Sequence, residues 1–121
     1  MNYLAIFIGG GLGSLARYGV SLFVLKAKFT NFPLATLISN TLACLILALG
    51  VYVFKEKLDS NTWLAPLLIT GFCGGFSTFS TFSNETFLLI QQGNYLWAAS
   101  NILISVFVGI GVIWMISSMK A

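Results

Sequence analysis

Four long apolar runs, joined by short polar connectors, make up almost the whole chain. They cover approximately residues 3–25, 32–54, 63–91 and 95–119. An α-helix needs roughly 20 residues to cross the hydrocarbon core of a bilayer, and three of the runs have about that length. The pattern therefore predicts an all-α integral membrane protein with four transmembrane helices, in a single domain that covers residues 1–121.

The third run is longer than the others and carries features that a continuous transmembrane helix does not need. Gly71, Gly74 and Gly75 loosen its backbone. Five hydroxyl side chains then follow within seven residues: Ser77, Thr78, Ser80, Thr81 and Ser83. Irregular backbone at membrane depth persists only where protein covers it or where it lines a wet cavity. We therefore expect the third helix to be broken mid-membrane and to face a polar path.

Two phenylalanines and one carboxylate complete this polar stretch. Phe79 and Phe82 are three residues apart, so they share one face of a helix. Such a pair commonly serves packing, but the edge of an aromatic ring is electropositive and can also face an anion. Glu85 ends the stretch and needs a partner or water inside a membrane.

The other runs contribute isolated polar residues, each with two interpretations. Arg17 either extends toward the membrane interface or places a positive charge in a wet vestibule that attracts anions. Asn40 either bonds to a neighbouring helix or donates to a passing anion. Asn101, Ser105 and Gly109 are spaced four apart on one face. The two polar residues either form interhelical bonds or continue a polar stripe, and the glycine admits a neighbour's backbone.

Small residues of the first run have the spacing of close helix contacts. Gly9 and Gly13 are four apart, as are Gly10 and Ser14. We interpret these glycines as packing positions. The two cysteines, Cys44 and Cys73, both lie in apolar runs, and we assign them to packing as well.

Composition and charge exclude several classes of protein. The chain is 58% hydrophobic and 7% charged, with a mean hydropathy of +0.94, which is far from an ordinary soluble domain. Its net charge of +3 is scattered over the ends of the apolar runs. Because nucleic-acid binding needs a clustered basic patch, we expect no nucleic-acid partner.

The lysines between the runs give almost no orientation preference. With four spans, one side of the membrane receives Lys55, Lys57 and Lys120, and the other receives Lys26 and Lys28. Three against two is a very weak bias. Either so short a chain gives weak statistics, or the protein inserts in both orientations and pairs as an antiparallel dimer.

Three motifs together resemble one family. The sequence GGGLGSLARY at residues 9–18, Asn40, and GFCGGFSTFSTFSNE at residues 71–85 are similar to the small bacterial fluoride channels, the Fluc or CrcB family. The resemblance covers the whole chain. It implies an antiparallel, dual-topology homodimer in the bacterial inner membrane. Such a dimer contains two pores that export fluoride passively across the lipid bilayer, and it performs no enzyme chemistry.

The resemblance also implies roles for individual residues. The ring edges of Phe79 and Phe82 face fluoride, and the Asn40 amide donates to it. The backbone carbonyls of Gly74 and Ser77, from both subunits, hold a central structural Na⁺. Further pathway residues are Ser80, Thr81, Ser105 and Arg17, and a possible polar track includes Thr78, Glu85 and Asn101.

Two positions depart from the family pattern. Asn101 stands where many members have Tyr, and Gly109 stands where some have Ser. We therefore expect the polar track of the fourth span to be shorter or wetter than in those members.

Two other functions fit four short spans. A small multidrug exporter couples protons through an acidic residue in its first span, where this chain has Arg17 instead; Glu85 is the remaining candidate for that role. A structural subunit without transport would use its hydroxyls as contacts between helices. Efflux of a cationic dye, or the absence of any ion flux, would distinguish these functions from a channel.

Overall fold

The computed structural model describes residues 2–27 and 32–120, and in these ranges the chain is helical with no β-strand. In chain order the helices are α1 (Asn2–Ala27), α2 (Leu34–Ala48), the π-helix η1 (Leu49–Val53), α3 (Lys55–Ser60), the π-helix η2 (Pro66–Cys73), α4 (Gly74–Phe76), α5 (Phe79–Gln91) and α6 (Tyr95–Lys120). The prediction of an all-α chain is confirmed for this part. Lys28, which entered the charge comparison, lies outside the described residues.

Three of the described helical stretches are long and apolar enough to cross a membrane. They are Asn2–Ala27, Leu34–Val53 and Tyr95–Met119. These stretches correspond to the first, second and fourth apolar runs. In the third run, η2, α4 and α5 follow one another as shorter helices.

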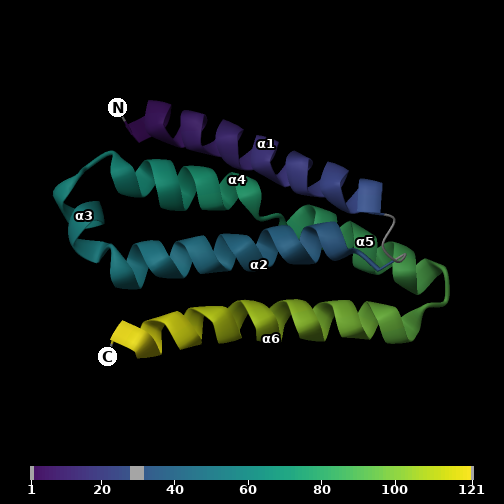
Figure 1. Ribbon diagram of the computed structural model, residues 1–121. Helices are drawn as coiled ribbons and strands as arrows, with labels where there is room; N and C mark the ends of the chain where they lie inside the picture. Colours follow the sequence, from purple (N-terminus) through teal and green to yellow (C-terminus); the bar gives the residue numbers. More distant parts are fainter. Residues whose placement is uncertain (1, 28–31, 121) are drawn as a thin grey trace.

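The long helices run roughly alongside one another (Figure 1). In this view α1 and α6 lie at the two outer sides, and α2 and the series η2, α4 and α5 lie between them. The first helix packs chiefly on η2 and α4, while α2 packs chiefly on α6. Both ends of the chain lie at the same end of the bundle. The junction of α4 and α5 therefore lies beside helices from both halves of the chain.

The helical path of the third run is interrupted at two residues. Ser77 has φ −82° and ψ 157°, and Thr78 has φ −153° and ψ 121°, so both are extended. Gly71 lies in η2, and Gly74 and Gly75 lie in α4. The glycines were the predicted place of the interruption. The interruption falls instead on the first two hydroxyl residues after them.

The glycines instead allow two helices to approach closely. A methyl group on Gly9 would meet the carbonyl oxygen of Leu67, and one on Gly13 would meet the carbonyl oxygen of Phe72. Two glycines of the opposing segment also lie close to the backbone of α1: Gly71 and Gly75. Without side chains between them, the two backbones come into direct contact. The predicted packing role of Gly9 and Gly13 is therefore confirmed, whereas Ser14 is exposed.

Candidate functional site

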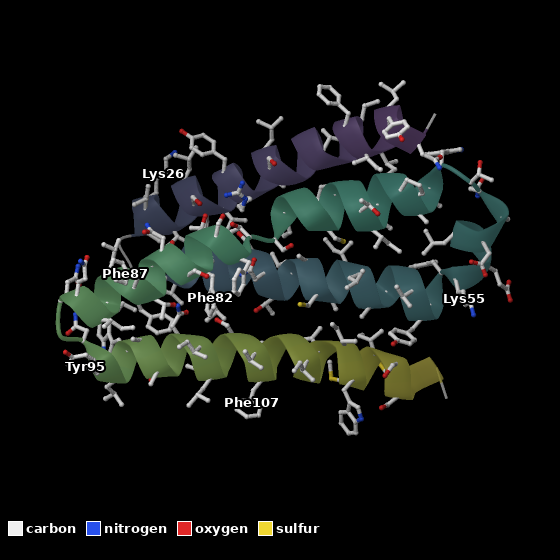
Figure 2. The ribbon with its side chains drawn as sticks, turned by 180° about the vertical axis from the view of Figure 1, so that it is seen from behind. Lys26, Lys55, Phe82, Phe87, Tyr95 and Phe107 are labelled. Carbon is white, nitrogen blue, oxygen red and sulfur yellow. The ribbon has the colours of Figure 1, made fainter. Side chains whose placement is uncertain are left out.

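A pocket of about 300 Å³ lies beside the interruption and draws residues from three helices. Its lining combines amide and hydroxyl groups with two phenyl rings, and Figure 2 shows Phe82 on the side of α5 that faces the bundle. The lining residues are Asn40, Cys44, Ser77, Thr78, Phe79, Phe82, Ser105 and Val106. The fold thus brings together positions that are far apart in the sequence.

Asn40 binds the backbone of the interruption with both ends of its amide. The Thr78 N–H donates to Asn40 Oδ1 at 2.7 Å, and Asn40 Nδ2 donates to the Thr78 carbonyl at 3.2 Å. These bonds satisfy backbone groups that have left the helix. Because Nδ2 carries two hydrogens, one remains for another acceptor. The two interpretations of Asn40 are therefore compatible: it bonds a neighbouring helix and still offers a donor to the pocket.

The hydroxyl groups that follow form a local network at the start of α5. Thr78 is the N-cap, and its Oγ1 accepts from the Thr81 N–H at 3.3 Å. The same hydroxyl lies 3.2 Å from Thr81 Oγ1 and 3.4 Å from Ser80 Oγ. Ser80 is exposed, and Thr81 is half-buried. Capping explains why a helix restarts at Phe79 despite the preceding extended residues.

The two phenyl rings stand next to each other at this pocket. The ring centroids of Phe79 and Phe82 are 6.0 Å apart, with 39° between the ring planes. Phe79 keeps 79% of its surface exposed. A large aromatic group that is so exposed beside this pocket is available to a ligand or to a second protein chain.

Arg17 points to the interruption from the opposite side. Its Nε donates to the carbonyl oxygen of Gly75 at 3.2 Å, and the side chain is half-buried. The guanidinium has further N–H groups that this bond does not use. Arg17 thus brings a positive charge to the C-terminal end of α4, where helix carbonyls favour a cation.

The wall that α6 contributes has a half-buried residue at the pocket and a buried residue behind it. Ser105 lines the pocket, whereas Asn101 is only 1% exposed and lies behind it. The Ser105 hydroxyl is 3.4 Å from Asn101 Oδ1. A methyl group on Gly109 would lie 3.3 Å from the Cys44 sulfur, so this glycine admits a thiol rather than a neighbour's backbone.

Glu85 has a partner that the sequence analysis did not identify. The Thr36 hydroxyl donates to Glu85 Oε1 at 2.9 Å. The other carboxylate oxygen is buried and has no hydrogen-bond partner among the described residues. Thr36 precedes Asn40 by four residues, so both lie on one face of α2. That spacing was the signal that could have identified Thr36.

Two backbone carbonyls at the interruption have lost the donors of a continuous helix. In an α-helix the Gly74 and Ser77 carbonyls would accept from the N–H groups of Thr78 and Thr81. Those N–H groups bond instead to the side chains of Asn40 and Thr78. Gly74 is also exposed. Among the described residues no cluster of three His, Cys, Asp or Glu could hold a metal.

The fold and the site define a class of protein. Several apolar helices form a multi-pass membrane protein, and amide, hydroxyl and aromatic groups line a pocket between them that suits a small solute. The chain belongs to the CrcB family, because residues 4–116 match the family described as CrcB-like protein, Camphor Resistance (CrcB).

Curated relatives support the same assignment. The Fluoride-specific ion channel FluC of Coxiella burnetii (strain Dugway 5J108-111) is 44% identical over 116 residues, which cover 95% of this chain and 94% of the relative. The protein of the same name from Hydrogenobaculum sp. (strain Y04AAS1) is 42% identical over 116 residues, or 92% and 94% of the two chains. Fluoride-specific ion channel FluC 1 of Yersinia pseudotuberculosis is 46% identical over 103 residues, or 85% and 80%. These matches confirm the predicted family, and with it the prediction that the chain is not an enzyme.

Proposed function

We propose that this protein is a fluoride-selective channel that exports fluoride passively and thereby lowers its toxicity in the cytoplasm. The observation that carries the proposal is the pocket at the interruption, where the Asn40 amide, the Ser105 hydroxyl and two phenyl rings converge. These groups donate hydrogen bonds or present positive edges, which suits an anion. The names of the relatives identify fluoride as the ion for those proteins.

The chemistry that the pathway performs is replacement of water. Fluoride is small and strongly hydrated, so a bare ion in a low-dielectric core is prohibitively costly. The free hydrogen of the Asn40 amide and the edges of Phe79 and Phe82 replace water molecules one after another. A narrow pathway tuned to the smaller ion excludes chloride, because chloride is too large for it. The Arg17 charge raises the local concentration of anions near the interruption.

The pathway is completed by a second copy of the chain. Phe79, Ser80 and Gly74 are exposed in the single chain, although they lie at or beside the interruption. Exposed polar groups and an extended backbone do not face lipid. An antiparallel homodimer with dual topology covers them with the same residues of the partner, which gives two equivalent pathways.

Four membrane crossings follow from the same assignment. The series η2, α4 and α5 forms the third span, broken at Ser77 and Thr78, and it joins the three long apolar helices. An even number of crossings agrees with both chain ends lying at one end of the bundle. We place the protein in the bacterial inner membrane, where a channel can release cytoplasmic fluoride.

The site of the central Na⁺ consists of the carbonyls of Gly74 and Ser77 from both subunits. Their fit rests on the lost helical donors, since Asn40 and Thr78 side chains occupy the N–H groups that would otherwise bond to these carbonyls. Hard cations prefer such oxygen ligands. A sodium ion bound there would supply positive charge that holds the two interruptions together, and it would not be transported.

The test is fluoride efflux from liposomes that contain the purified dimer, measured with a fluoride electrode, with chloride-loaded liposomes as the control. We expect rapid fluoride release, almost no chloride release, and a loss of flux when Na⁺ is replaced by a large organic cation during purification. Liposomes that retain fluoride despite an intact dimer would exclude the channel.

The aromatic edges are tested by substitution within the same assay. We expect Phe82→Ile to slow fluoride efflux by about tenfold or more, because an aliphatic side chain lacks the positive edge. Phe107→Ile is the matched control, since Phe107 is 69% exposed on α6 and points away from the bundle in Figure 2. Equal efflux in the two variants would remove the rings from the mechanism.

A further inference from the structure

A buried chain of hydrogen bonds connects α6 to α5 behind the pocket. Ser105 Oγ lies 3.4 Å from Asn101 Oδ1, Asn101 Nδ2 donates to Thr86 Oγ1 at 2.9 Å, and Thr86 Oγ1 donates to the Phe82 carbonyl at 2.8 Å. Asn101 is 1% exposed, and Thr86 is 7% exposed. The chain therefore begins and ends at pocket residues but is itself shielded from the pocket.

We propose that Asn101 and Thr86 are positioning residues of the ion pathway, and that they act through Ser105 and Phe82 rather than by touching the ion. This inference rests on the proposed function of the same site. Asn101 is then not a member of the polar track, which was its expected role.

The direction of the bonds supports this role at both ends of the chain. The Thr86 hydroxyl can donate only one hydrogen bond, and it donates this bond to the Phe82 carbonyl. The bond fixes the backbone from which the Phe82 ring enters the pocket. Because Asn101 Nδ2 donates to the same oxygen, the Thr86 hydroxyl is held in this orientation.

At the other end, Asn101 Oδ1 holds the hydrogen of the Ser105 hydroxyl. The separation of 3.4 Å marks a weak bond, since good O–H···O bonds are about 2.7–2.8 Å long. When an anion enters the pocket, the Ser105 hydroxyl can turn to it at small cost. When no anion is present, the Asn101 carbonyl thus accepts the hydrogen of the Ser105 hydroxyl. This bond keeps the hydroxyl from donating to another group of the helix.

Burial makes the chain sensitive to the loss of one member. An apolar side chain in place of Thr86 leaves the Asn101 amide buried without its acceptor, and such an orphaned group is costly. The amide then turns to other partners. As a result, the Ser105 hydroxyl and the Phe82 carbonyl lose the hydrogen bonds that position them. By contrast, serine retains the hydroxyl and should preserve the chain.

The experiment compares Thr86→Val with Thr86→Ser in the fluoride efflux assay on purified dimers. Valine has the shape of threonine without the hydroxyl. We expect Thr86→Val to slow efflux by on the order of tenfold, the effect of one lost hydrogen bond on a barrier. Thr86→Ser should stay within about twofold of the wild type. Thr41→Val is the matched control, because Thr41 lies half-buried on α2 and does not line the pocket.

A double-mutant cycle separates positioning from mere stability. If Asn101 and Thr86 act through one chain, Asn101→Leu, Thr86→Val and the double variant should slow efflux by similar factors, so the effects do not multiply. Multiplying effects would overturn the proposal. If valine or leucine prevents assembly, Thr86→Ala and Asn101→Ala replace them in the same cycle.

The outcomes also distinguish this inference from the proposed function. Wild-type dimers that do not release fluoride would overturn both. Wild-type dimers that conduct, together with a Thr86→Val dimer that conducts equally well, would overturn only the positioning role. Slow efflux in both Thr86→Val and Thr86→Ser would also overturn it, because the hydroxyl would then not be the group that matters.

Discussion

At the scale of single residues, the pocket depends on side chains that replace backbone partners. Asn40 uses its Oδ1 and one of its amide hydrogens to bond the backbone of Thr78. Thr78 in turn uses its hydroxyl to cap α5. Each residue thus stabilises the interruption and at the same time presents a polar group to the pocket. Structural and functional roles are therefore joined in the same side chains.

A substitution can separate these two roles of Asn40. Asn40→Asp keeps an acceptor for the Thr78 N–H but removes both amide hydrogens. We expect fluoride efflux to fall by about tenfold or more, because a donor is replaced by an acceptor that repels an anion. Asn40→Leu also loses the acceptor, and each lost bond costs about 1 kcal/mol of stability, so its dimer should melt at a lower temperature.

Efflux and thermal unfolding in detergent are the two measurements. Asn94→Asp serves as control, because Asn94 is exposed between α5 and α6. If Asn40→Asp conducts like the wild type, the amide hydrogen is not the donor that the ion meets.

At the scale of elements, close contact between α1 and the η2–α4 segment holds the interruption in place. The contact needs glycines on both sides, because a methyl group on Gly9 or Gly13 would enter the opposing backbone. The same helix places Arg17 one turn beyond Gly13, where it bonds the Gly75 carbonyl. The packing face of α1 therefore also determines where its charge lies.

This packing predicts different effects for two neighbouring glycines. Gly9→Ala places a methyl group against the Leu67 carbonyl and should destabilise the fold by about 1–3 kcal/mol, the typical cost of overpacking. For Gly11→Ala, nothing lies within 4 Å of the new methyl group, so stability should change by about 0.5 kcal/mol or less. The midpoint of thermal unfolding measures both. Equal midpoints would mean that α1 does not approach η2 this closely.

At the scale of the whole molecule, a single chain leaves part of the candidate site exposed. Phe79 is 79% exposed, and the extended residues at the interruption lie beside exposed Gly74 and Ser80. A second, inverted copy is the partner that we propose for this face. The nearly balanced lysines at the ends of the four apolar runs of the sequence agree with insertion in both orientations.

Labelling of introduced cysteines tests this arrangement in intact cells. Asn61 and Gln92 are exposed and lie at opposite ends of the bundle, after α3 and after α5 (Figure 1). Asn61→Cys and Gln92→Cys are each placed in a background with Cys44→Ala and Cys73→Ala. With dual topology, a membrane-impermeant maleimide should label about half of the chains in each variant. Labelling of only one variant would establish a single orientation and would contradict the antiparallel dimer.

The sequence by itself determined the class of the protein, because crossing a bilayer depends on the length and hydropathy of a run and not on its neighbours. The motifs at residues 9–18 and 71–85, together with Asn40, also identified the family. The spacing of Phe79 and Phe82 on one helical face, and the polar face that contains Ser105, further placed these residues among the candidates.

Only the tertiary structure decided which groups bond to one another. The pairing of Asn40 with Thr78, the partner of Glu85 and the burial of Asn101 each join residues from different helices. The glycines looked like the place of the interruption, but their lack of side chains serves contact with α1, and capping by Thr78 sets the restart of the helix. A hydrogen bond between residues that are distant in the sequence depends on how the helices pack. The residue pattern of one helical run does not predict which helices pack against it.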